Sequence, residues 1–229
     1  MPEPLRIDVI TIFPAMLGGF LGESMLKRAA AMDAVRFQIV NLRDFSTDRH
    51  HTVDDRPYGG GPGMIMKAEP LFKAVESLRT PAARVILLTP QGRCFDQVMA
   101  REMTRASHLI FVCGHYEGID ERVSQALVTD EISIGDYILT NGTLAATVVI
   151  DAVVRLLPNV LGGEGATVEE SFDHNRLEYP QYTRPEVFHD MQVPEVLLSG
   201  DHAAIRHWRN EQAHRRTLER RPDLMKPPR

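Results

Sequence analysis

The sequence predicts an α/β fold with a mainly parallel sheet, and two observations support this prediction. Short apolar runs rich in Val, Ile, Leu and Phe alternate along the chain with longer segments of helical character. Two of these runs, at 85–88 and 109–113, are almost unbroken, which is typical of strands that are covered on both faces. Strands that alternate with helices indicate parallel neighbours joined by helical crossovers.

The expected strands cover 7–13, 35–42, 84–89, 108–113 and 131–139. The expected helices cover 14–32, 68–78, 95–105, 118–128 and 144–157. In sheets of this kind, ligands bind in the loops beyond the carboxyl ends of the strands. We therefore expect a functional site in the loops that follow the expected strands.

The pattern changes after residue 161. A polar stretch with three glycines in its first four residues has neither helical nor strand period, which predicts a linker or a functional loop. Farther along, Ser199 or Asp201 is a candidate N-cap of a helix, and a second basic helix is expected over 210–221. The chain ends in a Pro-rich tail at 226–229.

Charge is distributed unevenly along the chain. The 229 residues include 26 Lys and Arg against 31 Asp and Glu, a formal net charge of −5. Residues 201–229 alone carry a net charge of +4, whereas the remainder carries −9. A basic end on an acidic body is compatible with a polyanionic partner, although a solvated helix explains the same charges.

Cysteine usage and the N-terminus predict a soluble intracellular protein. Cys94 and Cys113 form neither a C-x-x-C pair nor a wider framework, so reduced thiols in the cytoplasm are expected. Glu3 and Asp8 lie where a signal peptide needs a basic start and an apolar core. No run approaches the ~18 apolar residues of a membrane helix, so no membrane partner is expected.

The glycines point to backbone-mediated binding. The segment DDRPYGGGPGM at 54–64 matches neither a P-loop nor a dinucleotide-binding fingerprint. It is either a tight surface loop or a backbone surface that a ligand can approach closely. The loops at 87–92, 113–123 and 133–142 combine glycine or proline with aliphatic side chains, which suits the edge and faces of a purine. Together they predict a cofactor pocket.

Metal and nucleophile sites have little support in the sequence. The nine histidines include no H-E-x-x-H motif and no Cys/His spacing that would close a zinc site. A G-x-S-x-G nucleophile elbow is also missing from the sequence. At the end of a strand, Cys113 is interpreted as buried packing rather than as a reactive thiolate.

Seven motifs follow one another along the chain: DDRPYGGGPGM, LLTPQG, CGHYEGIDERV, IGDYIL, IDAVVRLLPNVLG, YPQYTRPEVF and VPEVLLSGDHAAIRHWR. The same motifs occur in this order in the bacterial tRNA (guanine-N1)-methyltransferase family of the SPOUT superfamily. The resemblance extends from IDVITIFP at 7–14 to RRPDL at 220–224, which is nearly the whole chain. A chance match of this many motifs in the same order is not credible.

The resemblance implies a domain arrangement that periodicity alone does not suggest. Family members have an α/β domain threaded as a deep trefoil knot, a linker and a small helical C-terminal domain; knots are otherwise nearly absent from protein folds. On this pattern we expect a knotted S-adenosylmethionine-binding domain at 1–161. An interdomain linker that contributes to the active site is expected at 162–175, and a helical tRNA-binding domain at 176–229.

The resemblance also implies an activity. Family members use S-adenosylmethionine to methylate N1 of the guanosine at tRNA position 37, directly 3′ of the anticodon, when a guanosine precedes it. This modification helps to maintain the reading frame. Members work as homodimers with active sites built from both chains, so the expected partners are the tRNA anticodon stem-loop and a second copy of the chain.

The family's methyl-donor loops fall on the strand-end loops described above. The residues expected to bind the donor are Leu87, Leu88, Thr89, Pro90, Gly114, Tyr116, Glu117, Ile134, Gly135, Asp136, Tyr137, Ile138 and Leu139. The family's catalytic arginine falls on Arg155, and its general base, usually an aspartate before Ser-Phe, falls on Glu170. Without the resemblance, Arg155 is interpreted as a cation at a helix C-terminus and Glu170 as a solvated acid.

Several positions depart from the common family pattern. His115 replaces a frequent arginine, and Glu170 keeps the carboxylate of the usual aspartate on a longer side chain. At Asn141, Thr143 and Ala145 the family more often has Gly, Glu and Pro. Divalent-ion dependence is a family trait, but no ligand cluster in the sequence assigns a metal site. Two alternatives stay open: a related SPOUT methyltransferase acting on another RNA position, and a catalytically silent RNA-binding or donor-sensing protein.

Overall fold

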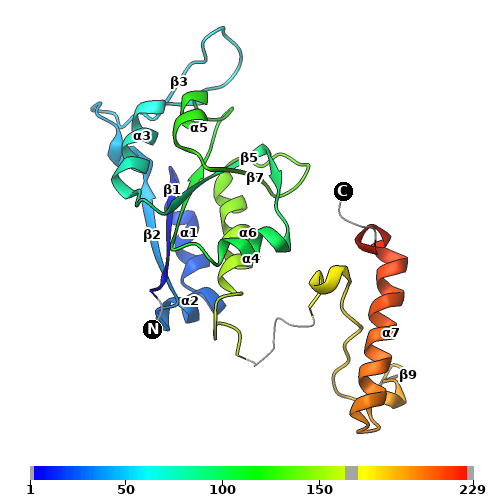
Figure 1. Ribbon diagram of the computed structural model, residues 1–229. Coiled ribbons are helices and arrows are strands. Elements are labelled where there is room, and N and C mark those ends of the chain that lie inside the picture. Colours follow the sequence, from blue (N-terminus) through cyan, green and yellow to red (C-terminus); the bar gives the residue numbers. More distant parts are fainter. Residues whose placement is uncertain (1–2, 163–169, 226–229) are drawn as a thin grey trace. The chain divides into compact units, whose positions relative to one another are not determined.

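The computed structural model describes residues 3–162 and 170–225 (Figure 1). The chain divides into two compact units, unit 1 at Met1–Leu161 and unit 2 at Gly162–Arg229. The expected linker at 162–175 lies partly outside the described residues, and the Pro-rich tail at 226–229 lies wholly outside them.

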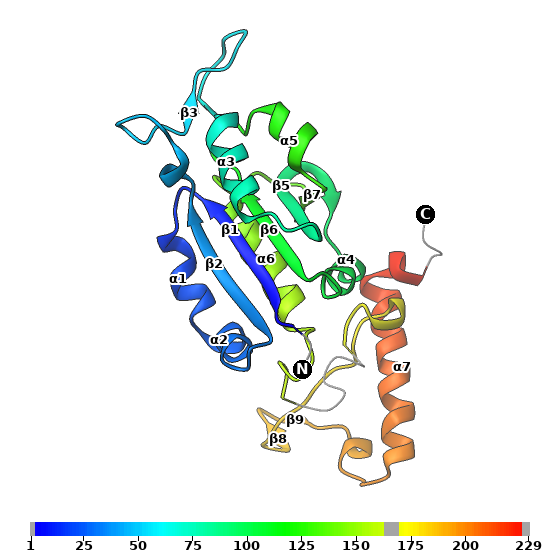
Figure 2. The same cartoon turned by 60° about the vertical axis from the view of Figure 1, so that its left-hand side comes forward.

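Unit 1 is built on five parallel strands in the order β2-β1-β6-β5-β7, which confirms the predicted α/β fold. The strands are β1 Leu5–Thr11, β2 Val35–Asn41, β5 Ala83–Cys94, β6 His108–Cys113 and β7 Asp130–Ser133. Helices α1 Ala15–Leu21, α2 Ser24–Ala31, α4 Gln97–Met103 and α6 Gly142–Val154 cover one face, and α3 Ala68–Leu78 and α5 Glu121–Leu127 cover the other (Figure 2). A 3-10 turn, η1 Leu42–Phe45, and an antiparallel pair, β3 Asp54–Asp55 with β4 Ile65–Met66, complete the unit.

The central strand β6 is buried along its whole length. Because alternate residues of a strand point to opposite faces, Leu109 and Phe111 pack with α1, α2, α4 and α6. Ile110 and Val112 pack instead with α3 and α5. Burial on both faces explains why the apolar run at 109–113 is almost unbroken.

Two expected elements differ in extent. The helix expected over 14–32 is divided into α1 and α2, because α1 ends at Gly22 and Ser24 has a left-handed backbone with φ 51°. The strand expected over 131–139 ends at Ser133, and the residues that follow form a loop. By contrast, β5 continues beyond the expected residue 89, with a register shift between Leu88 and Arg93.

Strands β5 and β7 are held together closely. Arg84 Nε donates to Asp130 Oδ2 at 3.1 Å across the pair. Farther along β5, a Cβ atom at Gly92 would overlap the backbone of Glu131 and Ile132. Only a residue without a side chain therefore fits where these two segments pass each other.

Unit 2 contains one long helix, α7 His202–Arg220. Its N-cap is Asp201, whose carboxylate accepts hydrogen bonds from the N–H groups of Ala203 and Ala204 at 2.9 and 3.1 Å. The prediction of a separate helix over 210–221 was wrong. Helix α7 continues through residues 210–220 without a break, because neither Gly nor Pro interrupts it.

Shorter elements surround α7 in unit 2. They are η2 Asp173–Asn175, β8 Val187–Phe188, β9 Met191–Gln192, η3 Glu195–Leu197 and η4 Pro222–Met225. The β8–β9 hairpin turns at His189 and Asp190, both with left-handed backbones, and the sequence pattern did not indicate it. Within the described ranges, no helix combines the length and apolar character that crossing a membrane requires.

Candidate functional site

A cavity of about 580 Å³ opens at the carboxyl edge of the sheet in unit 1. Its walls come from three segments, 87–91 of β5, 114–121 after β6, and 131–142 from β7 to the start of α6. These are the strand-end loops in which the sequence predicts a ligand site. The volume falls within the ~300–1,000 Å³ that is typical of small-molecule pockets.

All but one of the residues expected to bind the donor line this cavity. They are Leu87, Leu88, Thr89, Pro90, Gly114, Tyr116, Glu117, Ile134, Gly135, Tyr137, Ile138 and Leu139. Asp136, exposed in the loop after β7, is not among the residues that line the cavity.

Hydrogen bonds join the second and third loops to each other. Gly142 N donates to Gly114 O at 2.8 Å, which joins the start of α6 to the loop after β6. His115 and Asn141 pair in an antiparallel bridge beside this bond. Gly135 N donates to Ser133 Oγ at 3.2 Å and closes the third loop on itself.

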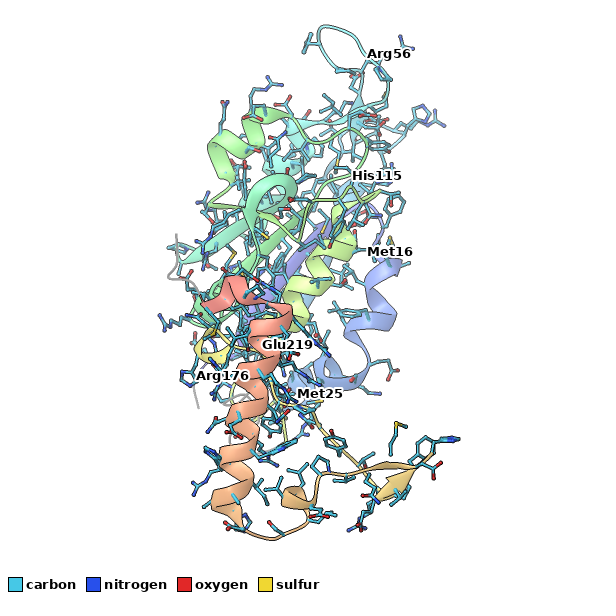
Figure 3. All side chains as sticks on the ribbon, turned by 90° about the vertical axis from the view of Figure 1, so that its right-hand side faces the viewer. Met16, Met25, Arg56, His115, Arg176 and Glu219 are labelled. Carbon is cyan, nitrogen blue, oxygen red and sulfur yellow. The ribbon has the colours of Figure 1, made fainter. Side chains whose placement is uncertain are left out.

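The glycine-rich segment 54–64 lies next to the second cavity loop. Glu117 N donates to Met64 O at 3.0 Å, and Met66 N donates to Gly118 O at 2.9 Å. The middle of the segment projects away from the sheet, where Tyr58 is wholly exposed and Arg56 stands at the edge of unit 1 (Figure 3). The segment is thus a surface loop whose base is hydrogen-bonded to the second cavity loop.

Electrostatically, the cavity favours a cation. Three carboxylates line it, those of Glu117, Glu121 and Glu131, and the described residues of its wall include neither lysine nor arginine. Such a wall attracts a positively charged organic ligand and repels phosphate groups. Apolar side chains such as Leu88, Ile134 and Ile138 supply surface for a flat ring.

Sequence reasoning missed part of this wall. Glu121 and Ser124 belong to α5, Glu131 to β7 and Ala145 to α6. The positions of Glu121 and Ser124, three residues apart on one helix, place both on the same face. This spacing was available in the sequence, but it became informative only once α5 was known to border the cavity.

Cys113 does not act as a nucleophile. Its side chain is 2% exposed, and burial raises the pKa of its thiol to about 12, more than a hydrogen bond from Thr143 lowers it. The packing role favoured by the sequence is confirmed. Within residues 3–162 and 170–225, no three His, Cys, Asp or Glu side chains come together as a metal site would require.

Arg155 lies at the far end of α6 from the cavity. Gly142, the first residue of α6, lines the cavity, whereas Arg155 is the C-cap of the same helix. At 1.5 Å of rise per residue, the two ends lie about 20 Å apart, which is far longer than an arginine side chain. Within one chain, Arg155 therefore does not reach the cavity.

Glu170 belongs to unit 2 and lies beside arginines of α7. A hollow of about 50 Å³ is lined by Glu170, Arg206 and Arg209 among others. The Arg209 guanidinium lies 4.7 Å from the centre of the Tyr179 ring. The segment 170–179 is thus packed against α7 rather than solvated on all sides.

Comparison with known proteins gives a consistent result. A family model described as tRNA (Guanine-1)-methyltransferase TrmD matches residues 5–227. Three similar proteins carry the name tRNA (guanine-N(1)-)-methyltransferase. The one from Moorella thermoacetica is 58% identical over 225 residues, 96% of this chain and 90% of the relative. That from Geobacillus kaustophilus is 54% identical over 223 residues (96% and 91%), and that from Bacillus subtilis 54% over 225 residues (97% and 93%).

Proposed function

This chain belongs to the tRNA (guanine-1)-methyltransferase family, and we propose that it transfers a methyl group from S-adenosylmethionine to N1 of guanosine 37 in tRNA. The target guanosine lies directly 3′ of the anticodon and is preceded by another guanosine. The observation that carries this proposal is the cavity at the carboxyl edge of the sheet, because its acidic and aliphatic walls suit a positively charged donor with a purine ring.

The cavity fits S-adenosylmethionine in shape and in charge. The donor supplies a methyl group on a positively charged sulfonium, which is a good electrophile without help from a metal. Glu117, Glu121 and Glu131 stabilise positive charge, and the backbone of the three loops offers hydrogen bonds to a purine edge. The chain's own task is to hold the donor so that its methyl group faces N1 in line.

Methylation of N1 requires removal of a proton, because the N1 lone pair is tied into the ring. We assign this step to Glu170 as a general base within ~2.6–3.2 Å of N1, a contribution of ~10²–10⁴-fold. Negative charge then builds towards O6 of the guanine. The guanidinium of Arg155 stabilises this charge through a hydrogen bond that strengthens in the transition state.

Arg155 takes this role only if the active site is built from two chains. The cavity and Arg155 lie at opposite ends of α6 in one chain. When two α6 helices pack antiparallel across a two-fold axis, the carboxyl end of each lies beside the amino end of the other. A homodimer of this kind brings the partner subunit's Arg155 to the cavity.

An exposed apolar surface supports this homodimer. Phe13, Met16 and Phe20, from α1 and the residues before it, and Leu144 and Val148 of α6 are all more than one-third exposed. The two helices are neighbours, and Figure 3 shows Met16 beside α6. A contiguous apolar patch on a soluble protein marks an interaction site. A second copy covering α6 here would also enclose the cavity.

We further propose that unit 1 has the trefoil knot of its family. Two observations agree with a chain threaded through itself: β5 passes close to β7 at Gly92, and Gly142 of the third loop donates a hydrogen bond to Gly114. The loops that make the knot would then be the loops that make the donor cavity.

The tRNA is proposed to bind through the basic end of the chain, in the cytoplasm where tRNA is found. Candidate phosphate contacts are Arg206, Arg209, Arg215, Arg216, Arg220 and Arg221. Phosphate contacts position a nucleic acid without reading its sequence, so they would orient the anticodon arm. The target base must then leave its stack to reach the donor, as in other base-modifying enzymes.

The test of this proposal is methyl transfer by wild type, Glu170→Gln and Glu170→Asp on unmodified tRNA. We expect Glu170→Gln to lose at least ~100-fold in turnover with unchanged donor affinity, and Glu170→Asp to retain most of it. Wild-type turnover by Glu170→Gln would contradict the base assignment. Donor binding without transfer to tRNA would instead identify a donor-sensing protein, and a methyl group on another position a related methyltransferase.

A further inference from the structure

We propose that Thr217 is a positioning residue for methyl transfer, because it fixes to α7 the segment 170–179 that carries Glu170. This inference rests on the proposed role of Glu170. Thr217 itself lies in the last turns of α7 and is not among the residues that line the donor cavity.

Thr217 is buried in a helix that is otherwise mostly exposed. Its exposed fraction is 0%, and only Ala213 shares this burial among the residues of α7. Buried positions on a helix usually hold apolar residues, so a hydroxyl here calls for an explanation. Its Oγ donates to Ala213 O at 2.7 Å and accepts a hydrogen bond from Leu177 N at 2.9 Å.

The bond to Leu177 closes a folded segment. Phe172 N donates to Arg176 O at 2.7 Å, and Glu178 N donates to Ser171 Oγ at 3.1 Å. Thr217 is therefore connected to Ser171, the residue after Glu170, through Leu177 and its neighbour Glu178. Arg176 Nη1 also donates to Asn210 Oδ1 at 3.2 Å, and Figure 3 shows Arg176 beside α7.

The backbone of this segment needs an external support. Phe172, His174 and Asn175 all have left-handed backbones, with φ of 75°, 50° and 54°. A bulky residue such as Phe172 rarely adopts this conformation unless the surroundings impose it. A segment with three such residues would relax once released, and the direction of Glu170 would change with it.

The experiment compares Thr217→Val with Thr217→Ser in full-length dimeric protein. Valine keeps the shape of threonine but leaves Leu177 N without its acceptor, whereas serine keeps the hydroxyl. We expect Thr217→Val to lose about 10- to 100-fold in single-turnover methyl transfer, the scale of a misplacement near 1 Å. Thr217→Ser should restore the rate to within roughly threefold of wild type.

Two further readouts separate positioning from general damage. Affinity for S-adenosylmethionine, measured by calorimetry, should not change in Thr217→Val, because the described wall of the donor cavity comes from unit 1 alone. The loss should fall on kcat, with KM for tRNA changed by no more than about twofold. If Thr217→Val does not fold, Ser171→Ala removes the partner of Glu178 N instead, and it should lower kcat in the same way.

The outcomes distinguish this inference from the proposed function. If Glu170→Gln turns over like wild type, the base assignment fails regardless of Thr217. If Glu170→Gln is inactive but Thr217→Val turns over at the wild-type rate, the positioning role is overturned. Equal losses in Thr217→Val and Thr217→Ser would assign the effect to packing rather than to the hydroxyl. If Thr217→Val cannot be studied, a wild-type rate for Ser171→Ala would likewise overturn the positioning role of Thr217.

Discussion

The two-chain active site leads to a sharp prediction for mixed dimers. Arg155 lies about 20 Å along α6 from Gly142 at the cavity, so each site would combine the cavity of one chain with the arginine of the other. One chain carries Gly135→Val, which places a side chain at a φ of 145° and against the Tyr137 ring, and so disrupts the cavity. The other chain carries Arg155→Ala.

In a mixed dimer of these two chains, one site has both defects and the other has neither. Two chains with different affinity tags are coexpressed, and mixed dimers are isolated by sequential capture and assayed for methyl transfer to tRNA. We expect each parent homodimer to be inactive and the mixed dimer to recover about half of wild-type activity, since one of two equivalent sites is intact. Inactive mixed dimers would rule out the two-chain site, because they would place cavity and arginine in the same chain.

Three further predictions concern the fold and the basic helix. Gly92→Ala should destabilise the protein by ~2–4 kcal/mol in urea unfolding, because the added Cβ meets backbone that cannot move; an unchanged midpoint would contradict the close passage of β5 and β7. Burial opposes the charge on Asp130, but hydrogen bonds from Arg84 and Thr129 outweigh it and hold the pKa of Asp130 below its usual value. The stabilisation from this lowered pKa is present above a pH of ~4 and is lost as the pH falls further. Asp130→Asn should therefore lower the urea midpoint at pH 7 more than at pH 3, and an equal lowering at both pH values would contradict the role of Asp130. Replacing Arg215 and Arg220 with Gln should reduce the salt dependence of tRNA binding by up to ~0.9 in log–log slope for each lost duplex phosphate contact, and an unchanged slope would make them solvated charges only.

The sequence predicted the sheet and the donor loops because both follow from local pattern. The run at 109–113 is apolar on both faces, and such a strand belongs at the centre of a parallel sheet. Once the strands were located, the loops at their carboxyl ends followed from topology. The observed cavity wall at Leu87, Gly114 and Ile134 therefore needed little more than strand order.

Features that depend on contacts between distant residues could not be predicted in this way. Thr217 looks like an ordinary residue of a polar helix until Leu177, 40 positions earlier, is placed against it. By contrast, the separation of Arg155 from the cavity was available in the sequence, because α6 begins directly after the third cavity loop and Arg155 lies at its other end. The β8–β9 hairpin has only two residues in each strand, too few for an alternating pattern.

Nucleoside mapping measures methyl transfer to N1 of guanosine 37 without any assumption about the active site. Unmodified tRNA with guanosine or adenosine at position 36 is incubated with the protein and labelled S-adenosylmethionine, then digested and analysed by mass spectrometry. We expect 1-methylguanosine at position 37 in the tRNA with guanosine 36, and much less in its adenosine counterpart. A methyl group at another atom or position, or none at all, would rule out this activity.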